Sequence, residues 1–585
     1  MHEDEHQNRV KPITSSVSRR HLIAGTSATV AAGVMGASLA RFGVLAQEAT
    51  PSPADNEGTP PSQEALDQQQ GGGDVISQAQ PQATTLGPAV PPEVSDNPDD
   101  WVLWNGNYRA DRSATNSTIS ADTVDQLTIA WSVPIEGASG FGGITSPVLV
   151  VGDRIYYQDN STNTFAVNRE TGEQVWRTDY NSTQAGPNGV AIGYGMVFGG
   201  IGVTTEVFAL NAETGDEVWK RKLSQNPREG ITGPPTVYDS VVYISTTPTY
   251  AGGDRGVLYA MDASKGDVLW TWDTNVDNLW GQAAVNSGGG LWYPIAVDDD
   301  GNIYFGVGNP APFPAGNGET RPGGNLYNSS MVSLNPAQGS LRWYYADAPH
   351  DLADHDFQNT PVLATIDYDG IPATLAIGSG KTGNVAAVLA DSGNLLWKVP
   401  VGTHNPYGDG RLLPEGDPVA VLPGAAGGVQ VPIAYANETV FVPVNEQSAD
   451  MNAASFSGLT PYDQATGLLV ALDVRTGSQR WSVALPSLPT GSVTIANDLV
   501  FVGMLSGVMR AYSTESGEQL WEQEFDAGFN APPSIAGDTL FVAVGGPKIL
   551  PRAETGTPVA GADNPGAPAT GNQYTPAIHA LRLSS

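Results

Sequence analysis

One repeated pattern constrains the fold of this chain more than any other feature. The segment Ala166–Trp176 reads Ala-Val-Asn-Arg-Glu-Thr-Gly-Glu-Gln-Val-Trp, and Ala209–Trp219 repeats it closely. Further copies are Ala260–Trp270, Ala471–Trp481 and Ala511–Trp521, and weaker ones end at Trp343 and Trp397. Self-similarity at one unit length indicates a repeat architecture, in which each unit buries its apolar face against its neighbours.

Each copy is predicted to form two strands joined by a tight turn. The Asp or Asn and the Gly are turn residues, and the Trp falls four residues after the Gly, on the second strand. The segments between the copies, such as Val148–Gln158, are short Val-, Ile-, Tyr- and Phe-rich runs, and no stretch has a sustained helical period. A tryptophan at one repeated position can pack each unit on the next, with its N–H bound to a partner.

The number of copies predicts an all-β, eight-bladed β-propeller, with seven blades as the alternative. Seven copies contain the Gly-x-x-x-Trp step. Trp131 follows Leu127–Ala130 without the turn, and Ala580–Leu583 resembles one more first strand that is cut short. We therefore expect four-stranded antiparallel blades over residues 101–585, with a first and a last strand that share one blade and close the ring.

Composition excludes several classes of partner and site. The 585 residues include 61 acidic and 27 basic side chains, and the formal net charge is −34. Such a chain repels nucleic acid and anionic lipid, so we expect neither as a partner. It contains no cysteine, which excludes disulfides, thiolate metal sites and haem attached through Cys-x-x-Cys-His.

The N-terminus predicts export. Residues 1–46 contain Arg19-Arg20, an uncharged stretch from Leu22 to Ala40, and Val44-Leu45-Ala46 before Gln47, which is the layout of a signal peptide. Ser18–Ile23 resembles the twin-arginine motif. We expect a periplasmic, cell-surface or extracellular protein without stable membrane insertion after cleavage. The alternative is an uncleaved anchor, because the apolar stretch is long enough to span a bilayer.

Residues 47–100 are predicted to be a disordered linker. They contain ten acidic residues, no lysine or arginine, and many Pro, Gln, Ser and Gly. A segment of this composition cannot bury enough apolar surface to offset the entropy lost on ordering.

The repeat resembles the tryptophan-docking motif of pyrroloquinoline quinone (PQQ)-dependent alcohol and glucose dehydrogenases, and the resemblance covers about residues 101–585. Gly288–Trp292 with Tyr304–Pro312 is similar to the family's cofactor-floor and metal-ligand segment. His350–Asp356 is similar to its catalytic segment, most closely in the glucose-dehydrogenase-like branch. Non-catalytic propellers share the docking repeat, so the ordered set Asn309, Asp354 and Lys381 is the more specific feature.

The resemblance implies a role for each site residue. Asp354 matches the catalytic base that takes the proton of the substrate hydroxyl. Asn309 matches an amide ligand of Ca²⁺ and, with Asp354, would hold the metal beside PQQ. Lys381 matches the residue that hydrogen-bonds the quinone, and Trp292 the flat floor beneath it. For each residue the alternative is an ordinary turn, loop or packing role.

The sequence departs from the family pattern near these residues. The family's calcium-binding glutamate is missing from Tyr250–Gly256, where Asp254 is the available substitute. The tryptophan usual before the catalytic aspartate is Ala353, which we expect to open space beside the site, and the vicinal cysteine pair of the alcohol-oxidising branch is absent. His350, Asp351, Asp354, His355 and Asp356 offer a transition-metal site as a minor alternative.

The resemblance as a whole implies an exported quinoprotein-like oxidoreductase for a small alcohol or sugar, with PQQ and Ca²⁺ as cofactors and an external electron acceptor. The alternative is a non-catalytic binding or scaffold propeller that retains a degenerate site. The two are distinguished by whether Asn309, Asp354 and Lys381 converge.

Overall fold

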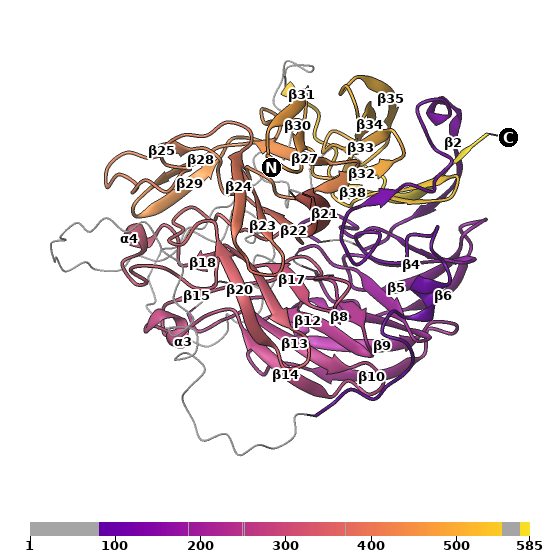
Figure 1. Ribbon diagram of the computed structural model, residues 1–585, viewed down its shortest axis with the longest axis horizontal. Helices are drawn as coiled ribbons and strands as arrows, with labels where there is room; N and C mark the ends of the chain where they lie inside the picture. Colours follow the sequence, from indigo (N-terminus) through magenta and orange to yellow (C-terminus); the bar gives the residue numbers. More distant parts are fainter. Residues whose placement is uncertain are drawn as a thin grey trace, which may run out of the picture. The chain divides into compact units, whose positions relative to one another are not determined.

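The computed structural model describes residues 81–584, except residues 138, 185, 249, 251, 369 and 553–573. All of them belong to the unit Ala31–Ser585. The expected signal peptide (1–46) and the first part of the expected linker (47–80) lie outside the described residues. Nearly all the regular structure is antiparallel β-strand, as the repeats predict (Figure 1). No described helix has the length and apolar composition needed to cross a membrane.

Eight sheets of four or five strands follow one another along the described part of the chain. The first four contain β3 (Leu149–Val151), β4 (Arg154–Gln158), β5 (Thr164–Asn168) and β6 (Gln174–Thr178); β7 (Val190–Gly193), β8 (Met196–Ile201), β9 (Glu206–Asn211) and β10 (Glu217–Lys222); β11 (Thr236–Tyr238), β12 (Val241–Thr246), β13 (Val257–Asp262) and β14 (Val268–Asp273); β16 (Ala296–Val297), β17 (Ile303–Gly306), β19 (Ser330–Asn335) and β20 (Ser340–Ala346). Each sheet is an antiparallel meander, because its strands pair in the order in which they follow one another along the chain, although the connection from β17 to β19 is long.

The remaining four sheets have the same order. They contain β21 (Val362–Tyr368), β22 (Ile371–Ser379), β23 (Asn384–Leu389) and β24 (Leu395–Pro400); β26 (Ala434–Ala436), β27 (Thr439–Glu446), β30 (Thr466–Asp473) and β31 (Gln479–Leu485); β32 (Val493–Ala496), β33 (Leu499–Gly503), β34 (Val508–Ser513) and β35 (Gln519–Glu524), with β1 (Ser113–Ala114) beside β32; β36 (Gly528–Phe529), β37 (Ser534–Ala536), β38 (Thr539–Gly546), β39 (Ala577–Leu583) and β2 (Leu127–Pro134). The expected all-β class with four-stranded units is therefore observed.

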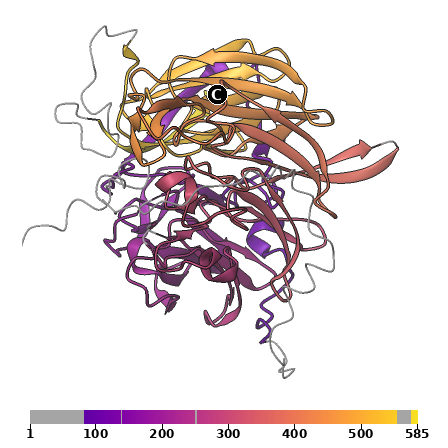
Figure 2. The ribbon, with the colours of Figure 1, turned by 90° about the vertical axis from the view of Figure 1, so that its left-hand side faces the viewer.

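The first long strand of the described residues pairs with the last. β2 runs antiparallel to β39, with Leu127 opposite Leu583 and Pro134 opposite Ala577. The indigo strand β2 accordingly lies among the yellow C-terminal strands (Figures 1 and 2). One sheet thus combines both ends of the repeat region, as expected from the truncated copies at Trp131 and Ala580.

The repeated tryptophans join each sheet to the next. The Trp176 Nε1–H on β6 donates to the Ala212 carbonyl oxygen in the β9–β10 turn, at 2.9 Å. The equivalent pairs are Trp131–Arg169, Trp219–Ala263, Trp270–Pro336, Trp343–Ala390, Trp397–Val474 and Trp481–Thr514. The prediction that each indole packs one unit on its neighbour, with its N–H satisfied, is confirmed for these seven residues.

The turn glycine of each repeat is required for this docking. Gly215 has φ +76°, and a Cβ atom there would lie 2.7 Å from the Trp176 ring. Gly172, Gly266, Gly339, Gly393, Gly477 and Gly517 have positive φ and a neighbouring tryptophan in the same way. Both the left-handed backbone and the close ring of the preceding repeat therefore favour glycine, which explains why each of these repeats has a glycine in its turn.

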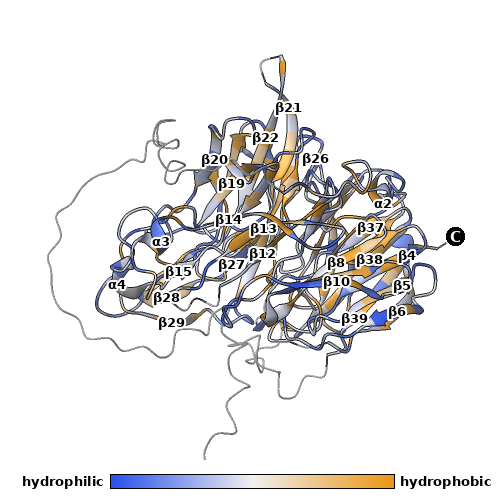
Figure 3. Ribbon diagram, turned by 90° about the horizontal axis from the view of Figure 1, so that it is seen from below, coloured by the Kyte–Doolittle hydropathy of each residue, from blue (hydrophilic) through white to orange (hydrophobic). Residues whose placement is uncertain are grey.

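Burial falls from one edge of a sheet to the other. All residues of β7 and β8 are buried, as are all eight of β38 in the last sheet, whereas β10, at the other edge of the β7–β10 sheet, buries only Trp219. Figure 3 accordingly shows hydrophobic colour on strands such as β38 and hydrophilic colour in many loops. The core thus consists of the inner strands and the docked tryptophans.

One irregular segment with two turns, Trp101–Ala114, contacts the start of every one of the eight sheets, in chain order. We call it the crossing segment. Its hydrogen-bonded pairs are Trp101 O with Val150 N, Trp104 Nε1 with Asn188 O, Tyr108 OH with Val237 O, Tyr108 O with Val297 N, Arg109 O with Leu363 N, Asp111 O with Tyr435 N, Arg112 O with Ile495 N, and the Arg112 guanidinium with Pro533 O. β1 then continues as a parallel partner of β32.

Short elements complete the described chain. Residues of the expected linker adjoin the sheets: the Thr84 N–H donates to Asp262, the Leu86 N–H donates to Ser240, and the Glu93 carboxylate accepts the N–H groups of Tyr194 and Gly195. The remaining elements are α2 (Pro92–Ser95), η2 (Val124–Gln126), η3 (Gly202–Thr204), α3 (Asp277–Trp280), α4 (Ala315–Gly318), the pair β15 (Ser287–Gly288) and β18 (Pro310–Ala311), and the sheet β25 (Val419–Val421), β28 (Ala449–Asn452) and β29 (Ser455–Leu459).

Candidate active site

The Lys381 ammonium group joins two buried carboxylates. Its Nζ lies 3.1 Å from Asp354 Oδ1 and 2.7 Å from Asp356 Oδ2. The side chains of all three residues are at most 8% exposed. Two of the predicted site residues, Asp354 and Lys381, are therefore in direct contact. Asp356 completes this ion-paired group, although the family resemblance assigned no role to it.

A local turn presents the Asp354 carboxylate. The Asp351 carboxylate accepts the N–H of Ala353 through Oδ1, at 2.9 Å, and the N–H of His355 through Oδ2, at 3.0 Å. Between these two bonds Asp354 has φ +63°, a conformation that costs a non-glycine residue free energy. Asp351 thus stabilises a strained turn that directs Asp354 toward Lys381.

Lys381 follows β22 and is fixed through its backbone. Its N–H donates to the Asp356 carbonyl oxygen at 2.9 Å. The preceding Gly380 has no space for a side chain, because a Cβ atom there would lie 2.1 Å from the same oxygen. The loop that carries the two carboxylates and the loop that carries the ammonium group are therefore in backbone contact.

Asn309 adjoins this ion-paired group. Its backbone N–H donates to Asp356 Oδ1 at 2.6 Å, and its Nδ2 donates to the Pro310 carbonyl oxygen at 3.1 Å. Its Oδ1 is buried without a hydrogen-bond partner among the described residues. A buried, unpaired amide oxygen is costly unless a ligand, water or cation binds it, so Asn309 is a candidate cation ligand.

Trp292 lies beside Gly308, on the same side as Asp356. The Trp292 Nε1 atom and Asp356 Oδ1 are each 2.9 Å from the position that a Cβ atom on Gly308 would occupy. Trp292 is 8% exposed, and its Nε1 has no hydrogen-bond partner in the described chain. The structure thus brings Trp292, Asn309, Asp354 and Lys381 together, with Asp356 in contact with two of them.

Burial and the ion pairs shift the pKa values in this group. Burial raises the pKa of Asp354 well above its usual range, against the opposing effect of the Lys381 ammonium group. Burial alone would lower the pKa of Lys381, but the carboxylates of Asp354 and Asp356 raise it overall. A protonated lysine therefore faces a carboxylate of increased basicity, which suits an acceptor for a hydroxyl proton.

An inserted sheet covers one side of the site. Ala353 is 3% exposed and packs in an apolar cluster with residues of β25 and β28, namely Val421, Ala449 and Met451. The His355 ring is bound to this insertion, with Nε2 2.9 Å from the Pro423 carbonyl oxygen. The space that we expected beside Ala353 is therefore filled, because the insertion between Trp397 and Trp481 packs into it.

Tyr250 and Phe313 stand near the carboxylates. Their rings meet edge to face with centroids 6.5 Å apart, and Phe313 packs on the cluster around Ala353. Burial raises the pKa of Tyr250, and the charges of Asp356 and Asp354 raise it further. Tyr250 thus lies near the site and belongs to the segment Tyr250–Gly256, from which the family's calcium-binding glutamate is missing.

Asp254 has other partners. It is buried, and its Oδ1 accepts hydrogen bonds from Asn226 Nδ2 and Arg228 Nε, each at 2.9 Å. It is not one of the two carboxylates that pair with Lys381. Asp254 thus belongs to a separate polar group with Asn226 and Arg228, and no hydrogen bond or ion pair with Asn309, Asp354 or Lys381 is found for it in the described structure.

The two histidines of this segment do not form a metal site with the aspartates. The His350 ring nitrogens lie 2.8 Å from the Gly323 carbonyl oxygen and 3.2 Å from that of Asn317. Both Asp351 oxygens accept backbone N–H groups. Within the described ranges, no three His, Cys, Asp or Glu side chains are grouped so that they could hold a metal ion. The minor transition-metal alternative is therefore unsupported.

Comparison with known proteins gives the family. The model described as "Glucose/ethanol/alcohol dehydrogenase, beta-propeller domain" matches residues 101–199 and 224–409, which include Trp292, Asn309, Asp354, Asp356 and Lys381. The chain belongs to the PQQ-dependent dehydrogenase family. A second model, "Outer membrane protein assembly factor BamB", matches residues 465–559 of this family member.

Curated relatives of this PQQ-family chain are named as dehydrogenases. It is 27% identical to quinohemoprotein alcohol dehydrogenase ADH IIB of Pseudomonas putida over 503 residues, which are 74% of this chain and 71% of that protein. It is 25% identical over 511 residues to the quinohemoprotein alcohol dehydrogenase of Comamonas testosteroni, covering 74% and 70%. The expected kinship with PQQ-dependent enzymes is confirmed.

A solved structure confirms the fold. The quinohemoprotein alcohol dehydrogenase ADHIIG from Pseudomonas putida HK5 superimposes with a TM-score of 0.71 at 23% identity, covering 84% of this chain and 81% of that one. The PQQ-family fold is thus shared although fewer than one residue in four is identical.

Proposed function

We propose that this chain is a PQQ-dependent dehydrogenase that oxidises a hydroxyl group of a small alcohol or sugar. The contact of Lys381 with Asp354 and Asp356, beside Asn309 and Trp292, carries the proposal. Convergence of these side chains was the feature that distinguishes an enzyme from a scaffold. The dehydrogenase names of the relatives agree with the proposal.

The residues present fit a quinone and an oxygen-seeking cation. Asn309 offers a buried, unpaired amide oxygen, and Asp354 offers a carboxylate, both of which Ca²⁺ accepts as ligands. Trp292 offers a flat aromatic surface and Lys381 an ammonium group for a quinone oxygen. Bound PQQ would supply the hydride-accepting chemistry, and bound calcium the Lewis acidity. We leave Asp254 out of the ligand set because Arg228 and Asn226 bind its carboxylate.

Each residue of the chain then has a defined task. Asp354 accepts the proton of the substrate hydroxyl at its carboxylate oxygen, and its raised pKa strengthens it as a base. Lys381 keeps Asp354 ionised and oriented. Asp356 fixes Lys381 and the backbone of Asn309, and Asp351 holds the turn that presents Asp354.

The scaffold for this site is, in our proposal, a closed ring of eight blades. Three observations support it: the eight sheets in chain order, the pairing of β2 with β39, and the packing of Trp521 with Leu540 and Leu581 of the last sheet. The crossing segment, which contacts every sheet in turn, agrees with the same arrangement.

We also propose that the protein works outside the cytoplasm. The support is the twin-arginine-like Ser18–Ile23, which lies outside the described residues. After export the electrons would pass to an external acceptor, because the chain has no haem-attachment motif. Nucleic acid is not a proposed partner, given the net charge of −34.

A non-catalytic scaffold is the second candidate, and the match of residues 465–559 to the BamB model favours it. Titration of PQQ into the purified protein, with and without Ca²⁺ and followed by calorimetry, separates the two candidates. The enzyme proposal predicts calcium-dependent binding and turnover of an alcohol. An absence of binding at saturating PQQ and Ca²⁺ would leave the scaffold.

The variant Asp354→Asn makes this experiment specific. We expect it to bind PQQ but to lose about 10²- to 10⁴-fold in kcat, which is the usual contribution of a general base. Asp347→Asn is a matched control, because the buried Asp347 carboxylate pairs with the partly exposed Lys398 at 2.8 Å outside the site. Equal losses in both variants would argue against a catalytic role for Asp354.

A further inference from the structure

The crossing segment brings Trp104 to the aromatic floor of the site. Trp104 is 4% exposed and packs in one cluster with Trp292 and Tyr293, with Tyr250 at its edge. The Trp104 and Tyr293 rings meet edge to face, with centroids 5.5 Å apart and an interplanar angle of 65°. Trp292 thus does not stand alone beneath the candidate cofactor position but belongs to a group of four aromatic side chains.

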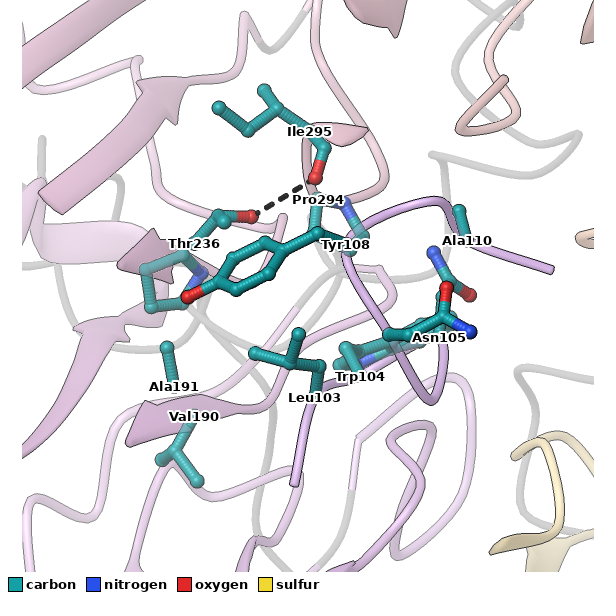
Figure 4. A pocket seen from close by; sticks show the side chains of 12 residues that line it. Leu103, Trp104, Asn105, Tyr108, Ala110, Val190, Ala191, Thr236, Pro294 and Ile295 are labelled. Atoms are coloured by element: carbon teal, nitrogen blue, oxygen red, sulfur yellow. Dashed lines mark hydrogen bonds between the residues drawn. The ribbon is translucent and has the colours of Figure 1, made fainter. Parts of the chain in front are cut away.

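The orientation of Trp104 is fixed from two sides. Its Nε1–H donates to the Asn188 carbonyl oxygen at 3.0 Å. A Cβ atom on Gly189 would come within 3.1 Å of its Cδ1. In Figure 4, Trp104 lies among Leu103, Asn105 and Tyr108 of the crossing segment, opposite the β7 residues Val190 and Ala191. The ring therefore has little freedom to tilt or slide.

The loop that fixes Trp104 also touches Trp292. A Cβ atom on Gly186 would lie 3.0 Å from Cζ3 of Trp292. Gly186 and Asn188, which are two residues apart, thus contact Trp292 and Trp104 respectively. Displacement of Trp104 would consequently move the loop that contacts the Trp292 ring. It would also disturb the packing around Tyr293.

Arg112 secures the far side of Trp104. Its guanidinium carbon lies 5.9 Å from the centroid of the Trp104 ring and 5.5 Å from that of Trp101. The guanidinium is fully buried and donates to the oxygens of Trp104, Asn105, Val493, Thr494 and Pro533. A buried cation with this many bonds is rigid, so Trp104 is supported by a fixed platform.

We propose that Trp104 is a positioning residue for the cofactor. Trp104 sets the height and tilt of the Trp292 ring and does not itself touch the cofactor. The inference rests on the proposed function, because it assigns Trp292 to the floor. Residues that support a binding residue from behind typically change affinity or activity about 10- to 100-fold when they are removed. We expect Trp104→Ala to weaken PQQ binding by this factor.

The control is the neighbouring tryptophan of the same segment. Trp101 is also buried and also lies against Arg112, but it packs in the cluster around Ile135 and Phe541 and not with Trp292. Trp101→Ala should therefore lower the melting temperature about as much as Trp104→Ala does and leave PQQ affinity within about twofold of wild type. Trp104→Phe, which keeps an aromatic ring, should restore most of the affinity.

The experiment measures melting temperature, PQQ affinity and the circular dichroism of bound PQQ, all in the presence of Ca²⁺. Selective loss of affinity with an altered dichroic band in Trp104→Ala, and recovery in Trp104→Phe, supports the inference. Unchanged affinity in Trp104→Ala, or an equal loss in Trp101→Ala, overturns it. If Trp104→Ala does not fold, Trp104→Leu takes its place with the same criteria. If wild type does not bind PQQ, the proposed function itself fails.

Discussion

The Lys381 ammonium group binds the Asp354 carboxylate at 3.1 Å, although 27 residues separate the two in sequence. Asp354 comes from the loop that connects β20 of one sheet to β21 of the next, and Lys381 comes from the loop between β22 and β23. Because the contact is buried, water screens it little, and the charge state of each residue depends on the other.

Removal of the ammonium group should therefore affect stability and function together. In Lys381→Met, two buried carboxylates lose their counter-ion, and we expect a loss of about 3–5 kcal/mol in unfolding free energy. Proton uptake by the unpaired carboxylates relieves this cost, so the loss should be smaller at pH 4 than at pH 7. Urea unfolding at the two pH values measures the difference, and a loss that is independent of pH would contradict the ion-pair account.

Asn309 should determine metal dependence. Asn309→Ala removes the unpaired Oδ1, and we expect PQQ binding to become insensitive to Ca²⁺ or its chelation by EDTA. Titrations of PQQ with added Ca²⁺ and with EDTA give the ratio of affinities in each protein. If the variant retains the wild-type ratio, Asn309 is not a ligand.

Asp351 should act on geometry and not on binding. Asp351→Ala removes the bonds to the N–H groups of Ala353 and His355, which hold Asp354 in its strained turn. We expect kcat to fall about 100-fold through misplacement of Asp354, while PQQ affinity stays within a few-fold of wild type. Asp351→Asn keeps an acceptor and should recover part of the rate. A collapse of PQQ affinity would instead indicate unfolding of the loop.

The docking glycines should be sensitive to any side chain. Gly215→Ala places a methyl group against Trp176 at positive φ, and we expect a loss of about 2–4 kcal/mol. Gly195 has φ +74° with no atom within 4 Å of the added Cβ, so Gly195→Ala should cost only the backbone strain, about 1 kcal/mol. Chemical denaturation compares the two, and equal losses would show that the tryptophan contact is unimportant.

Asp159 should make stability depend on pH. Burial raises the pKa of Asp159 to about 6, although the N–H groups of Ser161 and Asn163 oppose the shift. The folded state therefore holds this proton more tightly than the unfolded state, and stability falls as pH rises from about 4 through 6. Asp159→Asn should lack this fall and gain up to about 3 kcal/mol on wild type between pH 4 and pH 7. If the unfolding free energies of Asp159→Asn and wild type changed in parallel with pH, the raised pKa of Asp159 would be refuted.

The sequence predicted the repeats and most of the site because both are recorded in local patterns. The spacing between Gly and Trp lies within one turn and the strand after it, so it is visible in the local sequence. The docking of Trp176 on Gly215 follows once neighbouring units are stacked. Asn309, Asp354 and Lys381 were recognised through their motifs. Their convergence was a hypothesis that the contacts now support.

The features that the sequence did not reveal depend on contacts between distant segments. The attachment of Asp356 to both Lys381 and Asn309 depends on how three loops meet. The filling of the space at Ala353 depends on an insertion about 100 residues away, around Met451. The route of the crossing segment leaves no periodic signal, because its successive hydrogen bonds go to different sheets.

The central claim is that Asp354 removes a proton from a substrate hydroxyl while Lys381 holds it in place. The most direct measurement is a single-turnover reaction of the protein loaded with PQQ and Ca²⁺, in which absorbance follows cofactor reduction by a primary alcohol or an aldose. The account predicts reduction in wild type and a rate at least about 10²-fold lower in Asp354→Asn with PQQ still bound. Bound PQQ that no alcohol or sugar reduces, or equal rates in both proteins, would contradict it.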